Sequence, residues 1–256
     1  MVALISVLSS LETLHLQFRI PQSHPGWESR SLPPIKRFIL PALTSLYFQG
    51  VTGYLEELVI RIDTPQVDVM NITLFNQIET PRLAQFINRT SLREGDKARV
   101  CFNDWNTRVE LLAHWQVRTL EMVIRCGERD RQLSSIAQVC NPLHSLSTVE
   151  RLYIGYRKPN LVWKRMPSIE NTLWLQPLLP FTAVKNLYLS KEFAPAIAGA
   201  LQELVGGRIT EVLPSLQNIF VEGLEPSGPL QENIGQFVAA RQLSDHAIAV
   251  SDWDRD

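Results

Sequence analysis

The sequence has few cysteines and no long hydrophobic run, and each absence excludes a class of protein. Cys101, Cys126 and Cys140 are the three cysteines among 256 residues, and no two of them form a C-x-x-C pair. An odd and widely spaced set argues against a disulfide framework and against a cysteine-based zinc site. No apolar run reaches the roughly 18 residues that span a bilayer, so we expect no membrane partner.

An excess of either charge is also missing. The 25 Lys and Arg residues nearly balance the 26 Asp and Glu residues, which gives a formal net charge of -1. Such a chain has no general attraction for nucleic acid or for anionic lipid. The apolar start, MVALISVLSSL, has no basic segment before it and no convincing cleavage site. We therefore expect an intracellular protein, cytoplasmic or nuclear, that binds neither nucleic acid nor membrane.

The motifs of common enzymes are absent as well. None of the five histidines belongs to an H-E-x-x-H or a deaminase-type motif, and no G-x-S-x-G is present. Gly206-Gly207 is not followed by G-K-S/T, so it predicts a helix stop rather than a phosphate loop. Asp252, Asp254 and Asp256 form an acidic tail that we expect to be solvated. The sequence thus predicts a protein that is not an enzyme, with no catalytic residues, no metal site and no cofactor.

Two stretches of the sequence, 173 residues apart, nearly repeat each other. LPALTSLYFQGV covers residues 40–51, and LPSLQNIFVEGL covers residues 213–224. Both contain the pattern L-x-x-L-x-L with apolar residues accepted at the L positions, and repetition of one phrase indicates a repeat architecture. Eight copies occur along the chain, the fourth with Gly in place of the first aliphatic residue. Their first positions are residues 11, 43, 67, 95, 117, 149, 184 and 216.

Each copy predicts one short strand, and the stretches between copies predict helices. The second and third apolar residues of a copy are two apart, so they share one face of a strand, while the first lies on the turn before it. Helical patterns occur in GYLEELVIRI, in RLAQFI behind Thr80 as N-cap and Pro81, in SSIAQV, in KEFAPAIAGALQEL and in LQENIGQFVAA. Strand–helix units of 22 to 35 residues predict parallel strands joined by right-handed crossovers and stacked into a curved solenoid.

The phrase L-x-x-L-x-L is the core of leucine-rich repeats. The run from LPALTSLYFQGV to AQFINRT, and the closing QFVAARQLSDHAIAVSDWD, resemble the C-terminal region of F-box/leucine-rich-repeat proteins of mushroom-forming fungi. This resemblance implies an α/β leucine-rich-repeat solenoid of about eight irregular repeats, with a parallel sheet on its concave face. It covers residues 1–256 as a single domain, and it implies the substrate-recognition arm of an SCF-type ubiquitin ligase.

The F-box itself has no match in the sequence. Leu32-Pro33-Pro34-Ile35 lacks the acidic residue of an L-P-x-E start and leads straight into a repeat. Met1 lies almost directly at a repeat strand, so we expect the N-terminal cap and the F-box to be missing. Contact with a ubiquitin-ligase adaptor is therefore expected only if an upstream F-box exists. A truncated gene product without independent function is one alternative.

The expected binding surface is the concave side of the strands. The residues between the two inward apolar positions face it, and the candidate partner-binding residues are Tyr47, Arg99, Tyr153, Tyr188 and Phe220. His15, Asn71 and Glu121 complete this row, with Lys97 and Arg151 among its neighbours. A protein ligand is one interpretation; rings covered by a loop or a terminal segment are the other. A further alternative is a regulator of an enzyme, an inhibitor or a GTPase activator, with Arg99 or Arg157 as its critical arginine.

Overall fold

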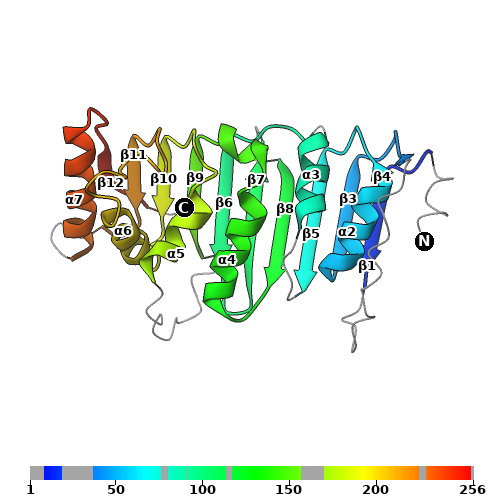
Figure 1. Cartoon of the computed structure of the whole chain (residues 1–256), viewed down its shortest axis with the longest axis horizontal. Helices are drawn as coiled ribbons and strands as arrows, with labels where there is room; N and C mark the ends of the chain where they lie inside the picture. Colours follow the sequence, from blue (N-terminus) through cyan, green and yellow to red (C-terminus); the bar gives the residue numbers. More distant parts are fainter. Residues whose placement is uncertain are drawn as a thin grey trace.

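Ten strands lie side by side in one sheet that follows the long axis of the molecule (Figure 1). The computed structural model describes residues 9–18, 37–75, 80–90, 92–113, 117–156, 170–224 and 229–254. The protein is a mixed α/β protein, and its large sheet is mostly parallel and open, with β1 and β12 at the two edges. The strand order is β1-β3-β5-β8-β7-β6-β9-β10-β11-β12.

All eight strands expected from the repeated phrase are present. They are β1 (Thr13–Gln17), β3 (Ser45–Gly50), β5 (Val69–Phe75), β6 (Lys97–Phe102), β8 (Arg118–Arg125), β9 (Arg151–Tyr156), β10 (Asn186–Leu189) and β11 (Asn218–Val221). Four further strands were not predicted: β7 (Asn106–Leu112), β12 (Ala249–Asp252), and the short β2 (Phe38–Ile39) and β4 (Ile62–Asp63), which pair with each other.

Helices cover one face of this sheet. They are α2 (Thr52–Arg61), α3 (Pro81–Arg89), α4 (Arg129–Cys140), α5 (Asn171–Leu175), α6 (Ala194–Gln202) and α7 (Pro229–Leu243), with the 3-10 turns η2 (His144–Thr148) and η3 (Gln176–Leu178). Figure 1 shows α2 to α6 in front of the strands, and α7 packs beside α6. None of the described helices is both long enough and apolar enough to cross a membrane.

The core lies between the strands and the helices, as the apolar spacing predicts. Leu46, Met70 and Ile219 are at most 1% exposed on the strands, and they belong to one cluster with the helix residues Leu55 and Leu201. The predicted stripe of α6 is fully buried, from Phe193 before the helix to Leu204 after it. Burial of this stripe against the sheet, rather than helix propensity, stabilises these short helices.

The N-terminus of α3 is capped from the preceding helix, not by its own first residue. Thr80 occupies the N-cap position and Pro81 begins the helix, as predicted, but the buried Thr80 side chain makes no capping hydrogen bond. The Glu56 carboxylate of α2 accepts hydrogen bonds from the backbone N–H groups of Arg82 (3.0 Å) and Leu83 (2.8 Å). Burial raises the pKa of Glu56, and these two hydrogen bonds oppose the rise. One acidic side chain thereby links two consecutive repeats.

A recurring backbone contact holds the strands in register. The carbonyl oxygen just before a strand accepts two N–H groups at the start of the next strand along the sheet, at 2.9–3.1 Å. The five carbonyls that do so are those of Glu12, Thr44, Asp96, Glu150 and Lys185. Because each contact joins equivalent positions of neighbouring units, it repeats within the two parallel parts of the sheet, β1-β3-β5 and β6-β9-β10-β11.

The middle of the sheet departs from the predicted order. The expectation that every strand pairs in parallel with its predecessor is wrong for β6, which pairs with β7 and β9 and not with β5. β7 runs antiparallel between β6 and β8, and no helix separates β6 from β8 in the described residues. A tight turn starts β7: the Asn103 side-chain oxygen accepts the N–H groups of Trp105 (2.9 Å) and Asn106 (2.7 Å).

This antiparallel insertion explains two irregular copies of the phrase. Gly95 stands where other copies place a leucine or valine, and a Cβ built there would lie 2.7 Å from both Leu111 Cγ and the Leu112 carbonyl oxygen. Leu111 of β7 thus fills the space that the leading residue occupies elsewhere. Val117 leads the fifth copy but is 47% exposed, because it lies between β7 and β8 in the antiparallel insertion rather than between a helix and a strand.

Candidate protein-binding surface

One row of side chains crosses the face of the sheet opposite the helices. No helix of the described residues lies on this face, and we call it the helix-free face. Strand register places ten residues in line, from one edge strand to the other. In spatial order they are His15, Tyr47, Asn71, Glu121, Glu110, Arg99, Tyr153, Tyr188, Phe220 and Ser251. All five candidate residues from the sequence lie in this row, although strand β7 inserts Glu110 among them.

Three of the candidates, Tyr153, Tyr188 and Phe220, form a stack of rings on β9, β10 and β11 that we call the ladder. The Tyr153 and Tyr188 ring centroids are 4.2 Å apart with an interplanar angle of 5°, and those of Tyr188 and Phe220 are 4.6 Å apart at 10°. All three side chains are half-buried. Parallel register alone produces this stacking, because in-register strands hold side chains of one row about 4.8 Å apart.

Two cations of β6 lie against the β9 end of the ladder. Lys97 Nζ is 5.0 Å and the Arg99 guanidinium carbon is 5.8 Å from the centroid of the Tyr153 ring. Neither cation forms an ion pair with another described residue, whereas Arg151 nearby is paired with Asp96. Burial lowers the pKa of Lys97, and the positive charges of Arg99 and Arg151 lower it further. A fourth candidate, Arg99, therefore lies beside the ladder and not at a separate site.

The Tyr153 hydroxyl is held in its neutral form. Burial is the main cause that raises the pKa of Tyr153 to about 12, and the adjacent Tyr188 adds to it. A neutral phenol donates and accepts hydrogen bonds without adding negative charge to the surface. The Tyr153 side chain therefore adds no negative charge beside Lys97 and Arg99 at neutral pH.

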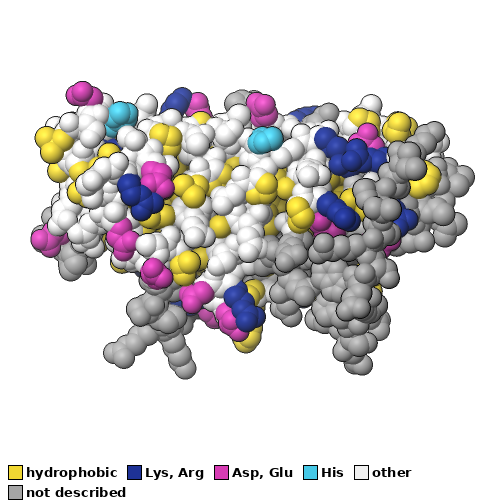
Figure 2. All heavy atoms as spheres, in the orientation of Figure 1, with side chains coloured by type: hydrophobic (Ala, Val, Ile, Leu, Met, Phe, Trp, Pro, Cys, Tyr) yellow, Lys and Arg dark blue, Asp and Glu magenta, His cyan; other side chains and the backbone are white. Residues whose placement is uncertain are grey.

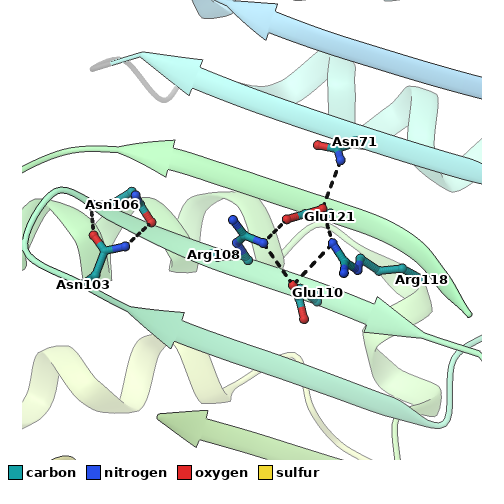
Figure 3. A network of polar contacts seen from close by, with 7 residues as sticks. All are labelled: Asn71, Asn103, Asn106, Arg108, Glu110, Arg118 and Glu121. Atoms are coloured by element: carbon teal, nitrogen blue, oxygen red, sulfur yellow. Dashed lines mark hydrogen bonds and ion pairs between the residues drawn. The ribbon is translucent and has the colours of Figure 1, made fainter. Parts of the chain in front are cut away.

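Polar side chains replace rings in the middle of the row (Figure 3). Glu121 is 5% and Glu110 7% exposed, and they lie opposite each other on β8 and β7. Arg108 is paired with Glu121 and lies 3.3 Å from Glu110, while Arg118 Nη1 lies 2.6 Å from Glu121 and 3.9 Å from Glu110. Asn71 donates a 3.0 Å hydrogen bond to Glu121. We call these five residues the central network; its charges cancel.

Tyr47 lies apart from the other candidates. It contacts His15 on β1, with ring centroids 5.7 Å apart. Four strand spacings separate it from Arg99, which is about 19 Å at the usual distance between strands. The central network fills that interval. A partner that contacts both Tyr47 and the ladder would have to cross the central network.

Trp253 is the residue that the sequence interpretation missed. It follows β12, its N–H donates to the Val221 carbonyl (3.1 Å), and its ring packs edge-on against Tyr188 (5.3 Å, 68°) and Tyr153 (5.9 Å, 63°). A terminal segment therefore covers part of the ladder, as one of the two interpretations of these rings proposed. No periodic pattern marks Trp253, because β12 lacks the repeated phrase.

The helix-covered face has a different character. Basic and acidic side chains are scattered over it, with basic side chains more frequent toward the right of the view and acidic ones toward the left (Figure 2). Several form pairs within one turn of chain, such as Arg61–Glu57 (2.9 Å), Arg131–Glu128 (2.8 Å) and Arg208–Glu211 (2.5 Å). Exposed pairs of this kind stabilise by less than about 1 kcal/mol and mark an ordinary solvated surface.

The remaining predicted residues have structural or unassigned roles. Cys140 is fully buried, and this burial raises the pKa of its thiol to about 12. Cys101 is half-buried and lies opposite Arg108 in strand register, on the outward face that its parity predicts. In the described ranges no group of three potential metal ligands comes together. Arg99 lies within a strand rather than on a rim loop, and Arg157 lies outside the described residues.

Comparison with known proteins adds no relative. No protein-family model, no curated protein and no solved structure matches this chain.

Proposed function

We propose that the chain is a leucine-rich-repeat solenoid that binds a protein partner on the helix-free face of its sheet. The fold part of the proposal is supported by the eight strands at the predicted positions and by the carbonyl contact that recurs from unit to unit. Helices on one face and one row of aligned side chains on the other suit a scaffold that presents a surface.

The observation that carries the binding role is the composition of the ladder. Tyr153, Tyr188 and Phe220 are aligned, half-buried rings beside two cations that lack an ion-pair partner among the described residues. Tyr and Arg are the residues most often found as anchors of protein interfaces. A structural role alone would leave no reason to place unpaired cations there, since the central network shows that this sheet can neutralise its own charges.

A substrate-recognition arm of an SCF-type ubiquitin ligase is the form of this function that we propose. The chain would supply recognition, and the adaptor contact would belong to an F-box, for which these 256 residues show no match. The proposal assigns no catalytic residue, cofactor or metal to the chain.

The experiment is affinity capture with matched variants. Tyr153→Thr/Tyr188→Thr removes two rings and keeps residues that favour strands. Leu243→Thr removes an apolar side chain that is 90% exposed on α7. We expect proteins captured from a fungal extract by the parent chain and by Leu243→Thr to be lost from the double variant. The proposal fails if all three folded proteins capture the same set.

A further inference from the structure

Trp253, which follows β12, shows that the ladder accepts an aromatic side chain. Trp253 is flanked in sequence by Asp252 and Asp254, so an aromatic residue between two carboxylates lies at the ladder. Asp252 is used within the fold, because its side chain accepts a hydrogen bond from the Leu224 N–H (2.9 Å). Trp253 remains half-buried rather than enclosed.

The charge at the far end of the ladder extends this pattern. Trp253 reaches the Tyr153 and Tyr188 rings from the side of β12. On the other side of the Tyr153 ring stand Lys97 and Arg99, which have no carboxylate partner among the described residues. A ligand that contacts the rings is therefore within reach of two positive charges that form no ion pair with a described residue, although Asp96 acts on Lys97 and Glu110 lies opposite Arg99.

We propose that the ladder recognises an acidic segment of the partner protein that carries an aromatic residue, and that Trp253 occupies the same rings when no partner is bound. The aromatic side chain of the segment packs on Tyr153 and Tyr188, and its Asp or Glu residues pair with Lys97 and Arg99. This inference rests on the proposed binding function and names the chemistry of its ligand.

Competition with Trp253 follows from this arrangement. A tethered segment has an effective concentration in the millimolar range, so a free peptide meets a ladder that is largely occupied. The apparent affinity of a ligand falls by the fraction of the molecules that are open. Removal of the Trp253 ring is thus expected to raise the affinity for such a segment by about tenfold.

The test uses a labelled hexapeptide, GSDWDG, titrated by fluorescence anisotropy into the whole chain and into its Trp253→Ala variant. We expect binding to Trp253→Ala and binding about tenfold weaker to the parent. Peptide GSDADG should not bind, and GSNWNG should bind about threefold to tenfold less tightly, since two exposed ion pairs are lost. The protein variant Lys97→Gln/Arg99→Gln, made in the Trp253→Ala chain, should lose as much as the GSNWNG peptide does.

Two further variants separate recognition from folding. Tyr188→Leu keeps an apolar side chain in the row and should weaken binding at least fivefold, whereas Tyr47→Ala, about 19 Å from Arg99 at usual strand spacing, should leave it unchanged. Equal binding of GSDWDG and GSDADG, or equal binding of GSDWDG and GSNWNG, would overturn the inference. Tighter binding of an eight-nucleotide oligouridine than of GSDWDG would also overturn it, because stacked rings beside cations can hold bases.

The outcome is distinguishable from failure of the proposed function. If the peptide does not bind but affinity capture still depends on Tyr153 and Tyr188, the ladder binds a partner of other chemistry and only this inference fails. If capture is independent of both tyrosines, the proposed function fails, whatever the peptide does.

Discussion

The central network and the ladder lie along the same face of the sheet, but they differ in whether their charged side chains form ion pairs. In the network, Arg108 and Arg118 meet the buried carboxylates of Glu110 and Glu121, and every charge has a partner (Figure 3). Beside the ladder, Lys97 and Arg99 contact the face of a tyrosine ring and pair with no described carboxylate. A closed set of charges stabilises the chain itself, whereas an open set is available to another molecule.

Strand direction accounts for part of this difference. The antiparallel pairing of β7 with β8 places Glu110 directly opposite Glu121, and like charges so close require cations between them. The parallel strands β9, β10 and β11 repeat one row position in register, so equivalent rings stack. The insertion of β7 thus separates a structural centre from a candidate binding region at the C-terminal end.

The largest expected effect on the free energy of unfolding comes from Glu121→Ala, which removes one of the two carboxylates of the central network. It leaves Arg108, whose side chain is 13% exposed, without its main counterion and removes the partner of Asn71. Breaking a buried pair costs about 3–5 kcal/mol in the free energy of unfolding, because a buried charge stays unpaired. Urea unfolding monitored by circular dichroism measures it.

Glu128→Ala is the matched control for that prediction, since Glu128 forms an exposed pair with Arg131. Its expected effect is below about 0.5 kcal/mol. A loss as small for Glu121→Ala as for Glu128→Ala would contradict the view that the network holds the centre of the sheet together.

Gly95→Ala is expected to have the second largest effect, because it tests whether β7 truly occupies the place of a repeat residue. The new methyl group would meet the Leu111 side chain and the Leu112 carbonyl oxygen at 2.7 Å, and the carbonyl cannot rotate away. Overpacking of this kind costs about 1–3 kcal/mol. The measurement is again the free energy of unfolding in urea.

Gly235→Ala serves as its control, because a Cβ at Gly235 in α7 meets nothing within 4 Å. Alanine favours a helix over glycine, so this variant is expected to be more stable by about 0.5–1 kcal/mol. Opposite signs for the two substitutions support the described packing of Leu111; equal signs would show that Gly95 has room for a side chain.

The sequence predicts the strands of this fold better than their order. The parity of the phrase identified side chains that share the helix-free face, and every predicted member from Tyr47 to Phe220 lies in the row. The prediction missed Glu110 of β7, and Glu121 precedes Arg99 in space. β7 was missed because its alternating residues Thr107, Val109 and Leu111 do not match the phrase. The pairing of β6 with β9 joins strands that are far apart in the sequence, so local sequence patterns do not predict it.

The candidate site was predictable to the same extent. Stacking of Tyr153 on Tyr188 follows from register once the strands are known. Trp253 reaches those rings only because β12 adds to the sheet after α7, and the closed network of Glu110 and Glu121 exists only because β7 runs antiparallel. Contacts between distant segments depend on the topology, which the spacing of leucines does not encode.

The smallest expected effect on stability belongs to Lys97→Met, which removes a positive charge beside the ladder that forms no ion pair with a described residue. The substitution removes the cation–π contact with Tyr153, which is stabilising, and also a positive charge that burial and two arginines disfavour. At pH 7 these two effects on the free energy of unfolding nearly cancel, within about 0.5 kcal/mol.

The same substitution has a pH dependence. The pKa of Lys97 is lowered in the folded chain, so the folded state loses this proton at lower pH than the unfolded state does. The parent should therefore gain stability relative to Lys97→Met as the pH rises from 7 toward about 10.4, the ordinary value for lysine. Lys185→Met, which removes a lysine that is paired with Glu150 (2.6 Å), is the control for loss of a paired lysine at pH 7. Urea unfolding of all three proteins at pH 7 and pH 10 decides the matter: a loss of several kcal/mol on Lys97→Met at pH 7 would mean that this charge, like those of the central network, serves the fold.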